Sequence, residues 1–155
     1  MKQRFTSKDT SINATKLPRI YSVLSKQLVG KTVIDYGCGK YFDNYIKKVD
    51  CKQLVGYDPF NRPDNNVLLS RYDVALCSNV LNVIDSLDAR DDVISNLRVL
   101  ASTVYITVYE GDRSGQGKAT KTDCYQTNMK VAEYIPELMK HFDSVTLKNG
   151  IITCC

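Results

Sequence analysis

The stretch "TVIDYGCGKYFDNY", residues 32–45, decides the fold class of this chain. It opens with a short β-branched run, continues with Gly37 and Gly39, and then takes on the apolar spacing of a helix. Strand, tight turn and helix in this order predict one unit of an open α/β sheet. Ligands bind such sheets beyond the carboxyl ends of the strands, and glycine lets the backbone approach them closely. We therefore expect a ligand at this turn.

The segments on either side extend the alternation of helix and strand. Their periodicity predicts helices over residues 16–30, 88–102 and 130–142, strands over 53–58, 73–77 and 103–110, and a hairpin over 144–154 about Asn149 and Gly150. The apolar run 66–69 is followed at once by the strand 73–77, whereas a parallel crossover needs about a dozen residues. We therefore expect the α/β class: a mostly parallel sheet with a C-terminal antiparallel hairpin and a reduced or missing third strand.

Length and composition favour one domain, residues 1–155, without a membrane span. Apolar residues make up 43% of the chain and charged residues 25%, and no apolar run approaches the roughly 20 residues that cross a bilayer. The N-terminus lacks the apolar core of a signal peptide, so we expect a cytoplasmic protein with reduced cysteines. No cysteine pair has CxxC spacing and the one histidine is His141. We therefore expect no metal site.

Positive charge is concentrated at the N-terminus. Residues 1–31 hold seven Lys or Arg against one Asp, a net charge of +6, whereas the whole chain has a net charge of +4. We expect residues 1–16 to form a basic, flexible arm, and such an arm could bind nucleic acid. A solvated tail without a partner is the alternative.

Two carboxylates at predicted strand ends indicate a cationic ligand that contains a nucleoside. Asp35 stands one step before the end of its strand, where it would repel a diphosphate but could hold an ammonium group. Asp58 ends the next strand, the usual position of an acid that accepts hydrogen bonds from ribose hydroxyls. A dinucleotide motif needs a third glycine where this chain has Phe42, which disfavours NAD. Ammonium, close backbone contact and ribose together describe S-adenosylmethionine.

The segments "VIDYGCG" and "GYDPF" resemble motifs I and II of the class I methyltransferases. The resemblance implies a Rossmann-like three-layer domain in which the glycine loop meets the methionine part of the cofactor. It also implies adenine contacts from Pro59 and Phe60 on one side and from the segment 77–84 on the other. The cofactor-binding residues expected from the pattern and the resemblance together are Asp35, Tyr36, Gly37, Cys38, Gly39, Asp58, Pro59, Phe60, Ser78 and Asn79.

A narrower resemblance covers about residues 10–135. The segments "TSINATKLPRI", "SNVLNVID" and "GKATKTDCYQTN" look like parts of methyltransferases associated with DNA phosphorothioation gene clusters, which are longer proteins. This resemblance implies a DNA-modification context, with nucleic acid or a nucleic-acid-binding protein as partner. It names no methyl acceptor.

Candidate catalytic residues follow two of the predicted strands. Methyl transfer is an in-line displacement, so holding nucleophile and methyl group in line supplies much of the rate. Asn79 is the candidate to orient the acceptor, and Glu110 or Asp112 to take a proton from it. For each of the three, a helix cap or a loop hydrogen bond is the alternative role.

The segment 111–128 is the candidate substrate-binding region, because long loops in compact domains are usually functional or disordered. Arg113, Lys118 and Lys121 could contact phosphate, and Tyr125 could stack on a base or donate its hydroxyl. A flexible cover over the cofactor is the alternative.

Three functions follow, in order of preference. The first is an S-adenosylmethionine-dependent methyltransferase that acts on nucleic acid or on a small molecule. The second is a binding module or partner subunit that holds S-adenosylmethionine without transferring its methyl group. The third is a nucleotide-binding oxidoreductase, which Phe42 and the C-terminal hairpin make the least favoured.

Overall fold

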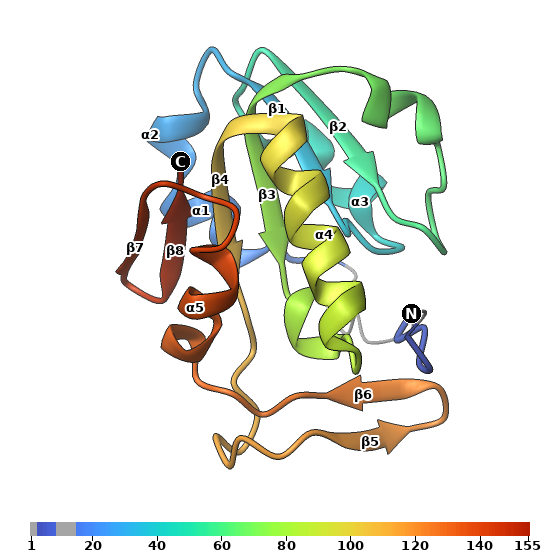
Figure 1. Cartoon of the computed structure of the whole chain (residues 1–155). Coiled ribbons are helices and arrows are strands. Elements are labelled where there is room, and N and C mark those ends of the chain that lie inside the picture. The colour runs from blue at the N-terminus through green and yellow to red at the C-terminus, as the bar shows by residue number, and fades with distance from the viewer. Residues whose placement is uncertain (1–2, 9–14) are drawn as a thin grey trace.

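A six-stranded sheet forms the centre of the computed structural model, which describes residues 3–8 and 15–155 (Figure 1). Its order is β2-β1-β3-β4-β8-β7. The strands are β1 (Thr32–Tyr36), β2 (Gln53–Tyr57), β3 (Tyr72–Ser78), β4 (Ala101–Thr107), β7 (Val145–Lys148) and β8 (Ile151–Cys154). The first four are parallel, and β8 is antiparallel to both β4 and β7. The predicted α/β class, with its mostly parallel sheet, is confirmed.

The predicted reduction of the third strand is also confirmed. Residues 65–69 form a 3-10 helix, η2 (Asn65–Leu69), so that β2 is an edge strand of the sheet. The Asp64 side chain caps η2 by accepting a hydrogen bond from Asn66 N at 3.0 Å. The Tyr72 hydroxyl then donates to Val67 O at 2.7 Å. These contacts hold the short connection between β2 and β3 in place of a strand and its crossover.

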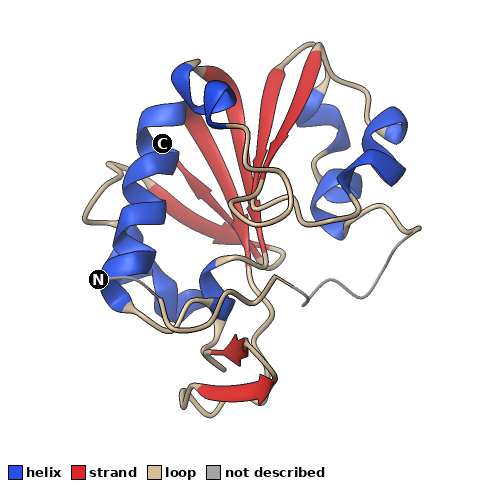
Figure 2. Cartoon of the chain, turned by 90° about the vertical axis from the view of Figure 1, so that its right-hand side faces the viewer, coloured by secondary structure: helices blue, strands red, loops and turns tan. Residues whose placement is uncertain are grey.

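Helices cover both faces of the sheet, as Figure 2 shows from the side. They are α1 (Arg19–Val23), α2 (Ser25–Leu28), α3 (Phe42–Tyr45), η1 (Ile46–Lys48), η3 (Leu81–Val83), α4 (Leu87–Leu100), η4 (Val131–Tyr134) and α5 (Ile135–Leu138). Strand residues alternate between two cores: Val33 and Leu76 pack with α1, α2 and α3, whereas Ile34 and Ala75 pack with α4 and α5. Three layers result, as expected.

Two of the predicted helices are shorter than their periodicity indicated. The segment 16–30 forms α1 and α2, which meet at Leu24; Tyr21 is buried, whereas Val23 is 40% exposed. The segment 130–142 divides into η4 and α5, because Pro136 has no N–H and stands in the first turn of α5. Each break changes which side chains the helix presents to the sheet.

The interpretation of residues 111–128 as a structureless loop is wrong in part. A second, two-stranded sheet, β5 (Lys118–Lys121) with β6 (Cys124–Gln126), lies there, beyond the end of β3 in Figure 1. All four residues of β5 are exposed, so that no apolar alternation marked the strand. Asp123, in the connection, adopts a left-handed φ of 58°, which Asp tolerates better than most residues.

The C-terminal hairpin matches its prediction. Asn149 and Gly150 have φ values of 54° and 74°, as the favoured two-residue hairpin turn requires. In the part of the chain that the structure describes, no helix has the length and apolar character needed to cross a bilayer.

Candidate functional site

A cavity of about 1080 Å³ lies at the carboxyl ends of the parallel strands. Its walls come from the glycine turn after β1, the ends of β2 and β3, the segment after β4, α1, residues 3–8 and the β5–β6 hairpin. Sites for drug-sized ligands measure about 300–1000 Å³, so this volume could hold a cofactor and a second small molecule. The cavity stands where the sequence predicted a ligand.

The N–H groups of residues 37–39 in the glycine turn are all bonded within the protein. Gly37 N and Cys38 N both donate to Tyr57 O, at 2.7 and 3.0 Å, and Gly39 N donates to Asp58 Oδ2 at 3.1 Å. Gly37 has a φ of 85°, and a Cβ there would collide with Val80 Cγ2. Position 37 therefore requires glycine for both conformation and space, and the turn is fastened to the end of β2.

Asp58 is buried, and one of its two oxygens is already used. Oδ1 accepts hydrogen bonds from Phe60 N at 2.9 Å and from Asn61 N at 2.8 Å. Oδ2 accepts the bond from Gly39 N and has room for one more donor. Asp58 was predicted to accept hydrogen bonds from both ribose hydroxyls. In the structure only Oδ2 can accept a further hydrogen bond, so Asp58 has room for one ribose hydroxyl.

Asp35 lines the cavity as a buried carboxylate that two tyrosines hold. The hydroxyl of Tyr21 on α1 donates to Asp35 Oδ2, and that of Tyr45 on α3 lies 3.5 Å from the same oxygen. Tyr45 also donates to Cys38 O at 3.2 Å. Burial raises the pKa of Asp35 to about 6, although both hydroxyls favour its charged form. No sequence pattern indicated the role of either tyrosine, because tyrosines at helical spacing look like core residues.

Two other predicted cofactor residues contribute less side-chain chemistry. The Tyr36 ring packs in the core, 5.1 Å from the Tyr57 ring, and its hydroxyl accepts a hydrogen bond from Asn96 Nδ2 at 3.2 Å. Cys38 is buried, and burial raises the pKa of its thiol, so the thiolate is disfavoured. Both residues border the cavity, but neither side chain is free to react there.

The remaining predicted cofactor residues line the cavity just after β2 and β3. Pro59 and Phe60 follow β2, and Phe60 is 44% exposed. Ser78 Oγ lies 3.0 Å from Thr107 Oγ1, and Asn79 N donates to Thr107 O at 2.9 Å. With a φ of 57°, Asn79 is held in a left-handed conformation at the end of β3. The structure thus brings all ten predicted cofactor residues to one cavity.

The two predicted proton acceptors differ. Glu110 lines the cavity, but its Oε2 accepts from Val131 N at 2.8 Å and its Oε1 lies 3.0 Å from Arg113. Asp112 is not among the lining residues; it accepts from Ser114 N, and Lys118 Nζ lies 3.2 Å from it. These hydrogen bonds lower the pKa of Asp112 to about 2, which makes it a weak base. Asp112 therefore lies outside the cavity in which a proton acceptor was expected.

Of the four predicted substrate residues, only Tyr125 borders the cavity. Its ring stacks on that of Phe5, with centroids 5.5 Å apart. Arg113 and Lys118 do not line the cavity; they form ion pairs with Glu110 and Asp112, respectively.

Lys121 is also outside the cavity, at the exposed end of β5. The three basic side chains predicted to contact phosphate therefore do not lie in the cavity.

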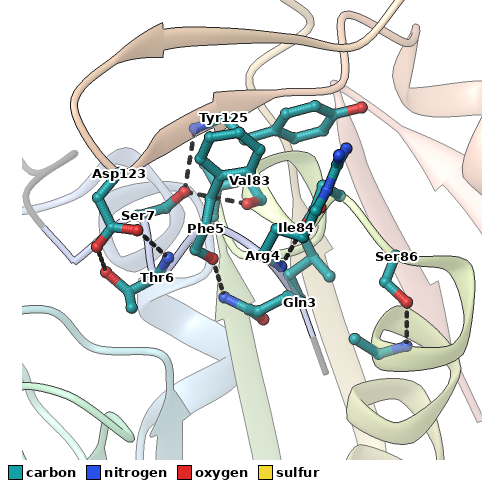
Figure 3. Close-up of polar contacts among 12 residues, drawn as sticks. Gln3, Arg4, Phe5, Thr6, Ser7, Val83, Ile84, Ser86, Asp123 and Tyr125 are labelled. Atoms are coloured by element: carbon teal, nitrogen blue, oxygen red, sulfur yellow. Dashed lines mark hydrogen bonds and ion pairs between the residues drawn. The ribbon is translucent and has the colours of Figure 1, made fainter. Parts of the chain in front are cut away.

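Residues 3–8 supply a wall of the cavity that the sequence did not indicate. They pack against β6 and the segment 83–85, as Figure 3 shows, although they belong to the predicted arm 1–16. Residues 1–2 and 9–14 of that arm lie outside the described residues. In the described ranges, no three His, Cys, Asp or Glu side chains come together as metal ligands.

Comparison with known proteins reveals the fold and no more. No family model and no curated protein matches the chain. Among solved structures, the chain is similar to the 1,6-didemethyltoxoflavin-N1-methyltransferase of Burkholderia thailandensis, with TM-score 0.68 and 17% identity over 88% of this chain and 76% of that chain.

Two further structures are similar. One is magnesium protoporphyrin IX methyltransferase of Synechocystis, with TM-score 0.57 and 18% identity over 87% of this chain and 75% of that chain. The other is an S-adenosylmethionine-dependent methyltransferase of Mesorhizobium loti, with TM-score 0.54 and 10% identity over 83% of this chain and 81% of that chain. The chain thus has the fold of the class I methyltransferases. The narrower resemblance to phosphorothioation-associated proteins stays a prediction.

Proposed function

We propose that this chain is an S-adenosylmethionine-dependent methyltransferase that acts on a small molecule. The observation that carries the proposal is the chemistry of the glycine turn. The N–H groups of residues 37–39 are bonded within the protein, and two buried carboxylates, Asp35 and Asp58, line the cavity beside them. A diphosphate would meet repulsion here, whereas a ligand with an ammonium, a sulfonium and ribose hydroxyls is complementary.

The residues present fit each part of that cofactor. Asp35 would hold the ammonium group, Asp58 Oδ2 a ribose hydroxyl, and Phe60 an adenine face. When bound, the cofactor supplies an activated methyl group. In support, the similar Burkholderia thailandensis enzyme was crystallised with S-adenosylhomocysteine and its own acceptor, and the Synechocystis enzyme with S-adenosylmethionine.

In the proposed enzyme, the rate comes mainly from holding the acceptor in line with the methyl group. The left-handed backbone of Asn79 is fixed by the bond of its N–H to Thr107 O, so its side chain can orient an acceptor at the end of β3. Glu110 is the remaining candidate to accept a proton, since it borders the cavity and Asp112 does not. Because Arg113 and Val131 N already bind Glu110, it would have to release one of them to act.

A small-molecule acceptor fits the site better than nucleic acid. The predicted phosphate contacts Arg113, Lys118 and Lys121 do not line the cavity. Arg113 pairs with Glu110, and Lys118 pairs with Asp112. The DNA-modification context stays a prediction from the sequence alone. A cofactor-binding module without transfer is the second candidate, because both oxygens of Glu110 are engaged.

Calorimetric titration with S-adenosylmethionine, S-adenosylhomocysteine and NAD tests the cofactor assignment. We expect micromolar binding of the first two and none of NAD. Asp58→Ala should lose affinity by about tenfold or more, since it removes a buried, charge-assisted acceptor. Asp64→Ala, which only uncaps η2, is the matched control and should bind as the native chain does. Binding of NAD alone would refute the assignment.

Turnover separates the enzyme from the binding module. Labelled methyl groups of S-adenosylmethionine should pass to the low-molecular-weight fraction of a cell extract and not to its nucleic acids. Label in neither fraction, with cofactor binding intact, would favour the module. Label in nucleic acid would overturn the small-molecule acceptor.

A further inference from the structure

We propose that the part of the cavity walled by residues 3–8, the segment 82–84 and β6 is the acceptor compartment, and that it takes a small, uncharged molecule with a planar ring. The inference rests on the proposed function, because it assigns the glycine-turn end to the cofactor. Figure 3 shows the contacts that build this compartment.

Asp123 fastens residues 3–8 to the β5–β6 hairpin. Its carboxylate accepts hydrogen bonds from Thr6 N at 2.9 Å and from the Thr6 hydroxyl, and its carbonyl accepts from Ser7 N at 2.8 Å. These are three bonds between residues more than a hundred positions apart in the chain. They place the N-terminal segment beside β6 as a wall.

Ser7 joins this wall to two other elements through one hydroxyl. Ser7 Oγ donates to Val83 O at 3.1 Å and accepts from Tyr125 N at 3.2 Å. The residue is 4% exposed and has a left-handed φ of 52°, which is uncommon for serine. A conformation of this kind persists only where the surrounding contacts determine it. The joint between residues 3–8, η3 and β6 is therefore specific.

The two residues before Thr6 add a second attachment. Arg4 binds Asp85 twice, through N to Oδ1 and through Nε to Oδ2, both at 2.9 Å. Phe5 lies against Tyr125 with an angle of 22° between the rings, a stacked arrangement. The segment is thus held at both ends.

Two uncharged polar side chains, those of Asn82 and Gln126, line this compartment. Asn82 Nδ2 donates to Gln126 Oε1 at 3.1 Å, and Gln126 Nε2 donates to Tyr109 O at 2.8 Å. Asn82 is 2% exposed, and its Oδ1 has no partner among the described residues. Since a buried oxygen without a partner is costly, it suits a ligand that brings an N–H or O–H when the amide turns toward it.

The charged side chains that line the cavity beside this compartment are those of Lys8 and Glu110. Glu110 is paired with Arg113, and Lys8 is exposed. By contrast, Asp35 and Asp58 are buried at the cofactor end. A charged acceptor would lose its hydration without a buried counter-charge, whereas a neutral ring next to Tyr125 and Tyr109 would not.

Saturation-transfer NMR with three matched fragments tests the compartment in protein saturated with S-adenosylhomocysteine. Benzamide, benzoate and benzamidine share one ring and differ in charge. We expect benzamide to bind at least about tenfold more tightly than the other two. Equal binding of benzoate or benzamidine would overturn the uncharged acceptor.

Two variants locate the fragment. Asp123→Ala removes the attachment of Thr6, and a chain that lacks residues 1–8 removes the wall itself. Each should weaken benzamide binding about tenfold while S-adenosylhomocysteine affinity changes less than about twofold. Asp91→Ala, whose partner is His141 on the surface, is the control.

Each outcome decides between the two proposals. Unchanged benzamide affinity in the truncated chain overturns the compartment, and so does an equal loss of cofactor affinity, because it would mean that residues 3–8 serve both ends of the cavity. If the truncated chain does not fold, Asp123→Ala decides by the same criteria. Failure of the native chain to bind S-adenosylhomocysteine would refute the proposed function instead.

Discussion

The two ends of the cavity are built from contacts of different range. At the cofactor end, Gly39 N binds Asp58 across 19 positions of the chain. At the opposite end, Thr6 binds Asp123 across 117 positions, and Ser7 binds Val83 across 76. A short-range site appears in the sequence as a motif with fixed spacing, whereas a long-range site leaves no such pattern. The difference also predicts that substitutions at the two ends have separable effects.

The largest effect is expected at Gly37. Gly37→Ala would force a side chain into a φ of 85° and against Val80, so we expect it to lower the free energy of unfolding by about 3 kcal/mol. Gly115→Ala has a φ of 76° but meets no atom within 4 Å, and should cost only about 1 kcal/mol. Urea denaturation of both variants measures the difference. Equal costs would show that Val80 does not confine the turn.

Asp35→Asn should make the chain more stable at pH 7 and weaken its binding of S-adenosylmethionine. The pKa of Asp35 is about 6 in the folded chain against 3.8 in the unfolded one, so the folded state favours its neutral form. The stability from this group is fully present below pH 3.8 and is lost as the pH rises through 6. From pH 4 to pH 7 the native chain should lose about 2 kcal/mol that Asp35→Asn retains.

Urea denaturation of both proteins across that range measures the effect, with cofactor affinity measured beside it. The variant should be the more stable protein at pH 7 and the weaker binder of S-adenosylmethionine. Parallel stability curves for the two proteins would contradict the assigned pKa.

A smaller effect is expected at the opposite end. Ser7→Ala loses the hydrogen bonds to Val83 O and from Tyr125 N and should cost about 1 kcal/mol of unfolding free energy. Hydrogen exchange at Tyr125 N should accelerate, while affinity for S-adenosylhomocysteine stays unchanged. Ser22→Ala, at an exposed position of α1, is the control. Loss of cofactor affinity in Ser7→Ala would mean that the two ends are coupled.

The smallest effects are expected for Arg113→Ala and Lys118→Ala. Their ion pairs lie at the surface, so each substitution should cost less than about 1 kcal/mol. Gel-shift titrations with duplex DNA at several salt concentrations complete the test. We expect the salt dependence of DNA binding to be the same in the variants and the native chain. A weaker dependence of DNA affinity on salt concentration in the variants would indicate that these side chains contact nucleic acid.

The sequence was sufficient to predict the sheet and the cofactor end. β1, the glycine turn, β2 and Asp58 follow one another within a short stretch, and the absence of a third strand follows from the length of one connection. What was missed depends on tertiary contacts. Tyr21 and Tyr45 come from separate helices to one carboxylate, and Asp112 turned toward its own loop. No local pattern specifies such pairings.

The docking of residues 3–8 has a consequence for the order of folding. These residues are synthesised more than a hundred residues before their partner Asp123. Contacts of such separation close the largest loops and form late. The glycine-turn end of the cavity can therefore be complete while the other end is still open, so that under the proposed function a nascent chain would bind the cofactor before it could select an acceptor.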